Sequence, residues 1–164
     1  METEPGQDVF EQRGISVRAM RREDGEVLVE IDATATGKPR PQYFKLMMER
    51  ALERSTMQIS LVAEIDANVV GFVIGSLYYG EFGQLEPAAA IDAIGVHADF
   101  KNIGVGSALM AQLRRNLGAL QIANLRTEVE WDDLELLGFF QAEGFRLSSR
   151  LCLELKLDPS QGRA

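Results

Sequence analysis

Residues Ile94 to Leu109 read IGVHADFKNIGVGSAL, and this stretch decides the fold. It joins an apolar run to a segment of helical spacing through a short loop that carries Gly104 and Gly106. Glycine lets a loop turn tightly with several N–H groups pointing one way, and a helix start adds further N–H donors and the positive dipole end. With Lys101 as a nearby cation, the stretch predicts a backbone cradle for a phosphate group.

Two other phosphate-binding loops fit the sequence poorly. A Walker A loop needs Lys and a hydroxyl residue after its last glycine, but Gly75 to Gly80 is followed by Glu81 and Phe82. A dinucleotide fingerprint needs a third glycine where Leu109 stands. The remaining alternative is that Gly104 and Gly106 serve only a tight turn between a strand and a helix.

The pattern on either side of this loop predicts a mixed α/β fold. An early hairpin implies antiparallel pairing, whereas strand–helix–strand units imply parallel pairing across a crossover, with helices on both sides of the sheet. The expected strands are 15–19, 59–65, 69–79, 88–96, 125–130 and a closing strand or strand pair within 145–157, and the expected helices are 22–31, 42–54, 106–117 and 133–142.

Composition indicates one soluble domain of ordinary size. The 164 residues are 46% hydrophobic and 26% charged. A chain of this length and hydrophobic content can bury a single core. The net charge of −8 argues against non-specific nucleic-acid binding and against docking on anionic membranes. We expect a domain over 15–157 between flexible tails at 1–14 and 158–164.

The chain has one cysteine, Cys152, and one histidine, His97. An intramolecular disulfide and a zinc site of Cys and His ligands are therefore excluded, and we expect no metal. Residues Met1 to Asp8 have neither the basic start nor the apolar stretch of a signal peptide, and the apolar run Val69 to Leu77 is too short to span a membrane, so we expect a cytoplasmic protein. We expect His97 to cap or pack, and Cys152 to be an inert thiol inside an apolar strand.

Two blocks of sequence resemble one known family. Lys101 to Gly106 (KNIGVG) resembles the Gln/Arg-x-x-Gly-x-Gly/Ala loop of the GNAT acetyltransferase superfamily, and Leu125 to Phe145 is similar to its fifth strand, fourth helix and Gly-Phe turn. Two such blocks in the family's order identify the family more specifically than either block does alone. The resemblance spans about 15–157 and implies a mixed, mostly antiparallel sheet of six to seven strands, splayed between strands 4 and 5, with helices on both faces.

The resemblance implies an N-acetyltransferase that moves an acetyl group from acetyl-CoA to a primary amine by direct attack in a ternary complex. The fourth strand would hold the pantetheine arm and thioester through its backbone, with Gly95 where a ligand approaches closely. The implied CoA-binding residues are Ile94, Gly95, Val96, Lys101, Asn102, Ile103, Gly104, Val105, Gly106, Ser107, Asp133 and Phe140. Asp133 stands where Asn is common, and Phe140 stands where many members have a proton-donating Tyr.

Two carboxylates are candidate general bases. Asp92 lies in the apolar segment AAAIDAIGV, where burial would raise its pKa and help it to accept a proton. Glu128 matches the base of ribosomal-protein N-terminal acetyltransferases of the family. The alternatives are a structural buried Asp92, a solvated Glu128, and a water that relays the proton.

The sequence leaves the acceptor open. Five acids in the eight residues 128–135 fit either a negative funnel for a cationic amine or a solvated rim before a helix. The acceptor is expected to be a small-molecule amine or a peptide amine, and the protein is a possible homodimer. The alternative functions are a CoA-binding regulatory module without turnover and a protein N-terminal or lysine acetyltransferase.

Overall fold

The computed structural model describes residues 10, 13–54, 59–79, 83 and 85–157. The chain divides into two compact units, Met1–Glu130 and Trp131–Ala164. The expected tail 158–164 and most of the expected tail 1–14 lie outside the described residues. The single domain expected over 15–157 stays a prediction.

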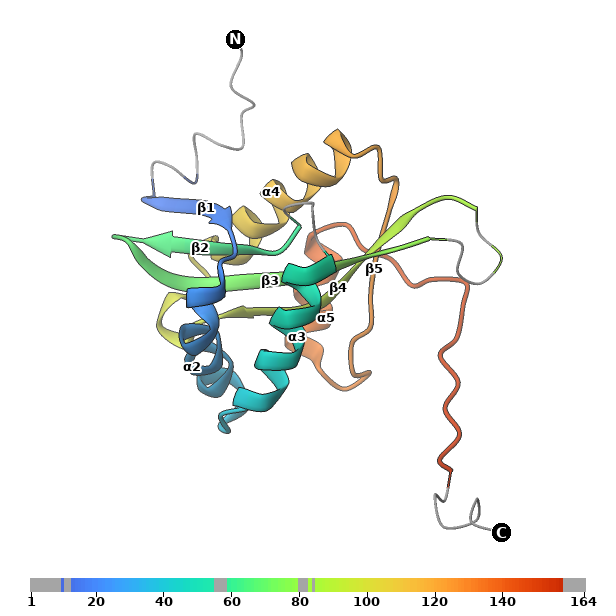
Figure 1. Ribbon diagram of the computed structural model, residues 1–164, viewed down its shortest axis with the longest axis horizontal. Coiled ribbons are helices and arrows are strands. Elements are labelled where there is room, and N and C mark those ends of the chain that lie inside the picture. The colour runs from blue at the N-terminus through green and yellow to red at the C-terminus, as the bar shows by residue number, and fades with distance from the viewer. Residues whose placement is uncertain (1–9, 11–12, 55–58, 80–82, 84, 158–164) are drawn as a thin grey trace. The chain divides into compact units, whose positions relative to one another are not determined.

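The described part of the first unit contains a five-stranded sheet with the strand order β1-β2-β3-β4-β5 (Figure 1). Pairing is antiparallel from β1 to β4 and parallel between β4 and β5. The predicted mixed, mostly antiparallel sheet is therefore confirmed. The strands are β1 (Ile15–Ala19), β2 (Leu61–Ile65), β3 (Asn68–Tyr78), β4 (Ala88–Val96) and β5 (Asn124–Thr127).

The predicted hairpin is formed by β2 and β3, whose sequences are rich in β-branched residues that suit a pleated, buried surface. Asp66 and Ala67 connect the strands, and both have positive φ angles, 49° and 62°. A two-residue turn with two positive φ angles matches the twist of the strands it joins. The Asn68 side-chain amide donates to the Asp66 carbonyl over 3.0 Å and supports the turn.

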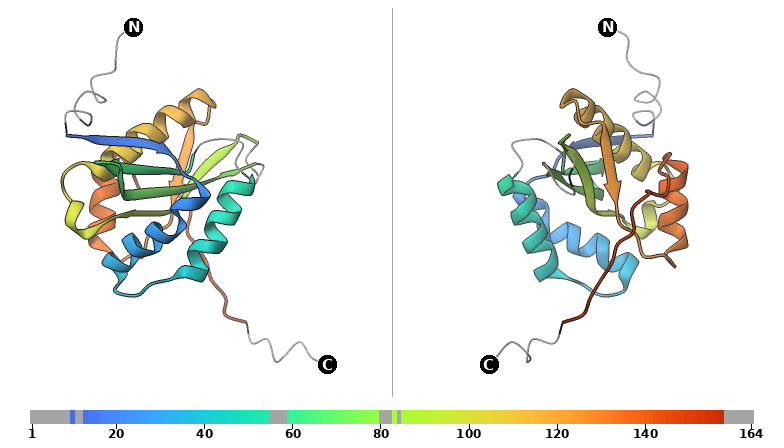
Figure 2. Two further views of the ribbon diagram at one scale, coloured as in Figure 1. Left: turned by 60° about the vertical axis from the view of Figure 1, so that its left-hand side comes forward. Right: turned by 90° about the vertical axis from the view of Figure 1, so that its right-hand side faces the viewer.

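Helices cover both faces of this sheet (Figures 1 and 2). On one face, α2 (Gly25–Thr36), which follows the short helix η1 (Arg22–Asp24), packs with α3 (Pro41–Arg54). On the other face lies α4 (Val105–Ala119), so close to β3 that a Cβ on Gly71 would be 2.7 Å from the Val105 side chain. The buried core of the first face contains Met20, Leu28, Ile31, Phe44, Met48, Ala51, Val62, Phe72 and Ile74.

An ion-pair cluster joins the first two strands to the helix that follows β1. The Arg18 guanidinium binds both carboxylate oxygens of Asp24, each over 2.8 Å, and Glu64 of β2 over 2.7 Å. Asp24 is 6% exposed and also accepts the Arg21 backbone N–H over 2.7 Å. Burial raises the pKa of the Asp24 carboxyl, but Arg18 and the Arg21 N–H outweigh it, so this pKa lies below its usual range.

We expect Asp24→Asn to lower the free energy of unfolding by about 3 kcal/mol at pH 7, because it leaves Arg18 without its bidentate partner. Since the folded-state pKa of Asp24 is depressed, its contribution is complete above about pH 4 and is lost as the pH falls further. Urea unfolding at pH 7 and pH 3 measures this, with Glu23→Gln in the same turn as control. A difference between wild type and Asp24→Asn that does not shrink with acid would contradict the assignment.

The second unit contains α5 (Leu134–Ala142) and an extended C-terminal segment. The strand or strand pair predicted within 145–157 is wrong, because none of these residues is in a strand. The alternating leucines that favoured a strand are 80–98% exposed, and Cys152 is exposed as well, so the buried thiol was also wrong. Alternation favours a strand only where a neighbouring strand pairs with its backbone groups. The described sheet therefore has five strands, not six or seven.

Candidate functional site at the end of β4

The segment that leaves β4 is held by short local contacts. The His97 backbone N–H donates to the Val70 carbonyl of β3 over 2.8 Å, which extends the pairing one residue beyond the strand. The His97 Nδ1 then accepts the Asp99 N–H over 3.2 Å and caps the short helix η3 (Ala98–Phe100). The prediction that His97 caps or packs is confirmed.

The glycine loop follows η3 and leads directly into α4. Gly104 has a φ angle of 102°, a backbone shape that favours glycine, and Asn102 has one of 62°, in the left-handed region that asparagine tolerates. The first hydrogen bond of α4 joins the Ala108 N–H to the Gly104 carbonyl over 2.9 Å, and Gly104 has no side chain to cap the helix. The N–H groups of Val105 and Gly106 therefore precede the helical ladder, where an anion can bind them.

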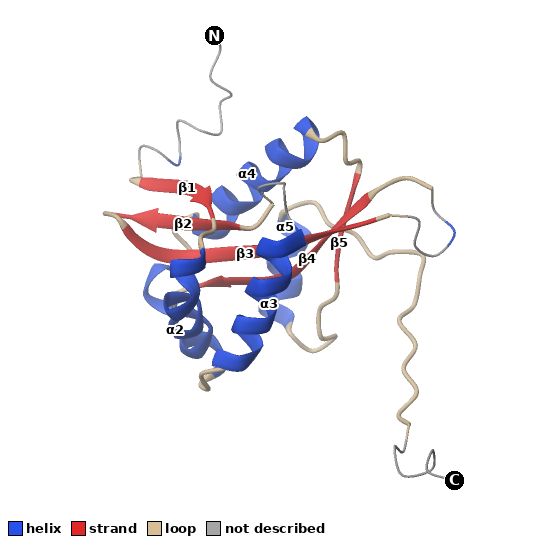
Figure 3. Cartoon of the chain, in the orientation of Figure 1, coloured by secondary structure: helices blue, strands red, loops and turns tan. Residues whose placement is uncertain are grey.

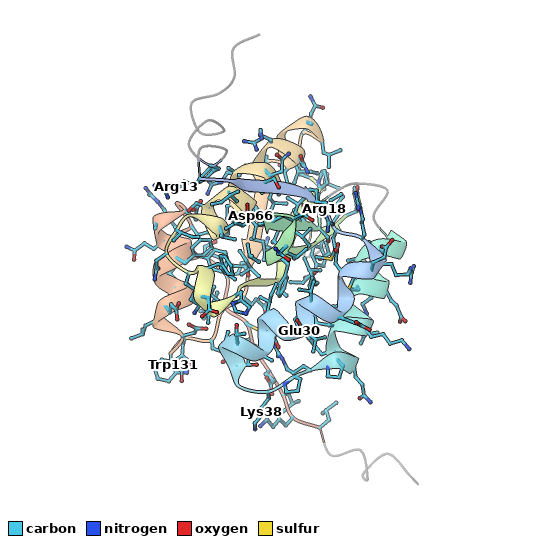
Figure 4. All side chains as sticks on the ribbon, turned by 90° about the vertical axis from the view of Figure 1, so that its left-hand side faces the viewer. Arg13, Arg18, Glu30, Lys38, Asp66 and Trp131 are labelled. Carbon is cyan, nitrogen blue, oxygen red and sulfur yellow. The ribbon has the colours of Figure 1, made fainter. Side chains whose placement is uncertain are left out.

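Two cationic residues lie at this loop. The half-buried Lys101 precedes it in sequence, as predicted. Arg13 comes from the segment before β1, and its Nη1 donates to the Ile103 carbonyl over 2.9 Å. Figure 4 shows Arg13 near the start of β1. Sequence reasoning missed Arg13, since no spacing connects it to a loop 90 residues away.

The strands β4 and β5 pair only over a short stretch. Their register runs from Ala88 opposite Asn124 to Ile91 opposite Thr127, where the Thr127 hydroxyl donates to the Ile91 carbonyl over 3.1 Å. Beyond Ile91, β4 continues to Val96 without a β5 partner among the described residues. Figure 3 shows β4 and β5, which are parallel where they pair, diverging at an angle. The predicted splay between strands 4 and 5 is therefore present.

A β-bulge accounts for the point at which the strands separate. Ile74 pairs with Ala93 and Gly75 pairs with Ile91, so Asp92 is an extra residue with no partner in β3. A bulge bends its strand and increases the local twist. Because this bulge comes directly after the last β4–β5 pair, it turns the rest of β4 away from β5.

The separation leaves backbone groups of β4 facing the place that β5 has left. The N–H groups of a strand alternate in direction, and that of His97 points to β3. The N–H groups of Ile94 and Val96 must therefore point to the opposite side, where β5 no longer pairs. A ligand can bind these donors by adding to the strand edge, as an extended peptide does.

The packing of β3 and β4 explains why a glycine stands at position 95, which the sequence did not show. A Cβ at this position would lie 2.7 and 2.9 Å from ring atoms of Phe72, its partner on β3. The space above Gly95 is filled by an aromatic ring from the core, not left open for a ligand. The role expected from its sequence context, a close approach by a ligand, therefore has no support on this face.

The two candidate bases lie at the same point of the sheet. Asp92 follows Ile91 and Glu128 follows Thr127, so each is one residue beyond the last pair of β4 and β5. Both side chains are exposed. The expected burial of Asp92 is wrong, because the bulge turns it out of the sheet.

Ser107 lies in the first turn of α4, and two further predicted site residues, Asp133 and Phe140, belong to the second unit. The Asp133 side chain caps α5 by accepting the Leu136 N–H over 3.0 Å. Phe140 is 3% exposed and packs on Phe139 and Phe145, with ring centroids 5.3 and 4.8 Å away. Their contribution to CoA binding stays a prediction.

Comparison with known proteins gives the family. The model of the acetyltransferase (GNAT) family matches residues 25–145, a span that includes both the glycine loop and α5. In the described part of the chain, no helix combines the length and apolarity needed to cross a membrane.

Several solved structures share this fold. Ard1 from Thermoplasma volcanium is 26% identical, with 83% of this chain and 85% of that chain covered at a TM-score of 0.69. The ribosomal-protein-alanine N-acetyltransferase from Brucella melitensis biovar Abortus 2308 is 18% identical, with coverages of 88% and 99% and a TM-score of 0.69. AAC(6')-Iy in complex with a bisubstrate analog is 18% identical, with coverages of 88% and 99% and a TM-score of 0.71. The family match over most of the chain, together with the splayed strands and the glycine loop, shows that this protein belongs to the GNAT acetyltransferase family and is an acetyl-CoA-dependent acyltransferase.

Proposed function

We propose that the protein transfers the acetyl group of acetyl-CoA to the nitrogen of a primary amine, with both substrates bound at once. The observation that carries this proposal is the end of β4–β5 pairing at Ile91 and Thr127. At that point the β4 edge becomes available, two carboxylates follow directly, and β4 leads into the glycine loop. The binding groups for the donor therefore follow along β4 from the point at which the candidate bases Asp92 and Glu128 lie.

The donor is proposed to lie along β4 and the loop. The diphosphate of CoA accepts the N–H groups of Val105 and Gly106 at the start of α4, where the helix dipole also favours negative charge. The thioester and the pantetheine amides accept the N–H groups of Ile94 and Val96. The other proposed contacts come from loop residues Lys101, Asn102, Ile103, Gly104 and Ser107, and from Asp133 and Phe140.

In the proposed reaction, the acceptor ammonium first loses a proton and the resulting amine then takes the acetyl group from acetyl-CoA. A carboxylate, Glu128 or Asp92, takes a proton from the acceptor ammonium and leaves a neutral amine with a lone pair. The nitrogen attacks the thioester carbon, the new C–N bond forms, and the C–S bond breaks as the pair of electrons returns to sulfur. A backbone N–H of β4 stabilises the charge that develops on the thioester oxygen. The amide nitrogen releases its surplus proton, and the CoA thiolate takes one up.

A similar structure supports direct transfer. AAC(6')-Iy was solved in complex with CoA-S-monomethyl-acetylneamine, a single bisubstrate analog. In this chain, the lone Cys152 lies in the second unit and is exposed, without a feature that points to an acyl-enzyme. Double-reciprocal plots of initial rates should therefore intersect, and Cys152→Ala should retain turnover. Parallel plots would contradict the ternary complex.

The acceptor is proposed to be cationic. The acids 128, 130, 132, 133 and 135 are all exposed and begin at the point where β5 ends. A group of exposed negative charges raises the local concentration of an amine that arrives protonated. Thiol release from acetyl-CoA, measured against polyamines, aminoglycosides, amino acids and short peptides, identifies the class. A protein that binds CoA but acetylates none of them, free lysines of proteins included, would overturn the proposal.

The CoA thiolate does not receive its proton from Phe140, which carries no hydroxyl. We expect Phe140→Tyr to leave the KM for acetyl-CoA and kcat within twofold of wild type, because Phe139 and Phe145 enclose the ring. The free energy of unfolding should fall by about 1–3 kcal/mol, since a hydroxyl is added to a buried position. Steady-state kinetics and urea unfolding measure both. A clear rise in kcat would show instead that the new hydroxyl reaches the sulfur.

A further inference from the structure

The segment before β1 contacts the glycine loop through two side chains. The Arg13 backbone N–H donates to the Phe10 carbonyl over 3.0 Å. The Arg13 Nη1 lies 3.1 Å, and the Phe10 ring 3.6 Å, from the position that a Cβ on Gly104 would occupy. Both side chains therefore rest against the glycine whose positive φ angle shapes the loop.

The Arg13 hydrogen bond fixes one peptide plane of the loop. In a trans peptide the carbonyl and the following N–H point in opposite directions. When Arg13 holds the Ile103 carbonyl over 2.9 Å, it also sets the direction of the Gly104 N–H, which comes immediately before the two donors at the start of α4. The exposed guanidinium brings a full positive charge to the loop at the same time.

We propose that Arg13 is a positioning residue for the diphosphate of CoA, which orients the glycine loop and supplies a cation beside it. The inference rests on the proposed binding of CoA at this loop. A segment that precedes the first strand thus becomes part of the donor site. Arginine suits both tasks, because its planar group can donate to a carbonyl with one nitrogen while the others face an anion.

The test compares variants of Arg13 with a charge-matched control. Arg13→Ala is expected to raise the Kd for CoA and the KM for acetyl-CoA about tenfold, the effect of one exposed charge-assisted contact, with kcat within twofold. Arg13→Lys keeps the charge and Arg13→Gln keeps a donor for the carbonyl, so each should recover part of the affinity. Arg22→Ala removes another exposed positive charge, in η1, and should bind CoA as wild type does.

A second measurement does not depend on the ligand. Hydrogen exchange at the Ala108 amide, which donates to the Gly104 carbonyl, should be faster in CoA-free Arg13→Ala than in CoA-free Arg22→Ala, because the loop before α4 is no longer held. A Gly106→Asp variant, which places a carboxylate at the start of α4, tests the donor site itself. Normal CoA affinity and unchanged exchange in Arg13→Ala, while Gly106→Asp does not bind CoA, would overturn the role of Arg13. If wild type itself binds no CoA, or Gly106→Asp binds it normally, the proposed donor site fails instead.

Discussion

Gly106→Asp is expected to remove the increase in melting temperature that CoA gives to the wild-type protein. A ligand that binds only the folded state raises its stability by mass action, so the shift measures binding directly. Gly106 lies in the first turn of α4, where its N–H is one of the proposed diphosphate donors. An aspartate there places a carboxylate next to a diphosphate, and like charges in contact cost several kcal/mol. We expect the affinity for CoA to fall at least about a hundredfold.

The same helix offers a matched control. Gly118 is exposed near the other end of α4, and a Cβ at that position would meet open space. Gly118→Asp introduces the same side chain and charge. It should leave CoA binding intact, because it lies at the end of α4 opposite the glycine loop. Circular dichroism establishes that both variants fold. Normal CoA binding by a folded Gly106→Asp protein would show that the glycine loop does not hold the diphosphate.

The second large effect is expected from the two carboxylates at the end of β4–β5 pairing. A general base typically contributes about 10²–10⁴-fold to the rate. We expect Glu128→Gln to lower kcat/KM for the amine by at least about a hundredfold, with the Kd for CoA unchanged. Glu128 is preferred over Asp92 because its match to the family lies within the longer of the two resembling blocks.

The pH profile separates the base from a residue that only attracts the acceptor. The acidic limb of kcat/KM reports protonation of the base, so it should disappear in Glu128→Gln and persist in Asp92→Asn if Glu128 is the base. Glu130→Gln, two residues further along, removes a charge from the same acidic cluster and should change only the KM for the amine. If the Asp92→Asn/Glu128→Gln double variant keeps its rate and its acidic limb, neither carboxylate is the base.

Much of the local structure could be predicted because it depends on patterns along the chain. The strand predicted at 88–96 is observed as β4 with those bounds, since an apolar run between two loop-forming segments marks both ends. The helix predicted at 106–117 is observed as α4, Val105–Ala119, because its buried leucines repeat every four residues. The positive φ angle of Gly104 likewise follows from the residue type that the loop requires.

Burial and strand pairing were harder to predict, because they depend on partners distant in sequence. Asp92 stands among apolar residues, yet the bulge turns it out to solvent. The alternating leucines near the C-terminus are equally misleading, since in the described chain no strand pairs with them. Gly95 is required by the ring of Phe72, which stands 23 positions earlier in the sequence and opposite it in the sheet.

The sequence by itself determined the class of fold, the position of the glycine loop between β4 and α4, and the family, because these depend on residue types at fixed short spacings. Only the tertiary structure decided where β4 and β5 separate, that Asp92 and Glu128 each directly follow the last pair of these strands, and that Arg13 donates to the Ile103 carbonyl of the loop. The physical reason is that hydrogen bonds and ion pairs between distant segments form wherever the folded backbone brings donors and acceptors together. Their partners leave no periodic signal along the chain.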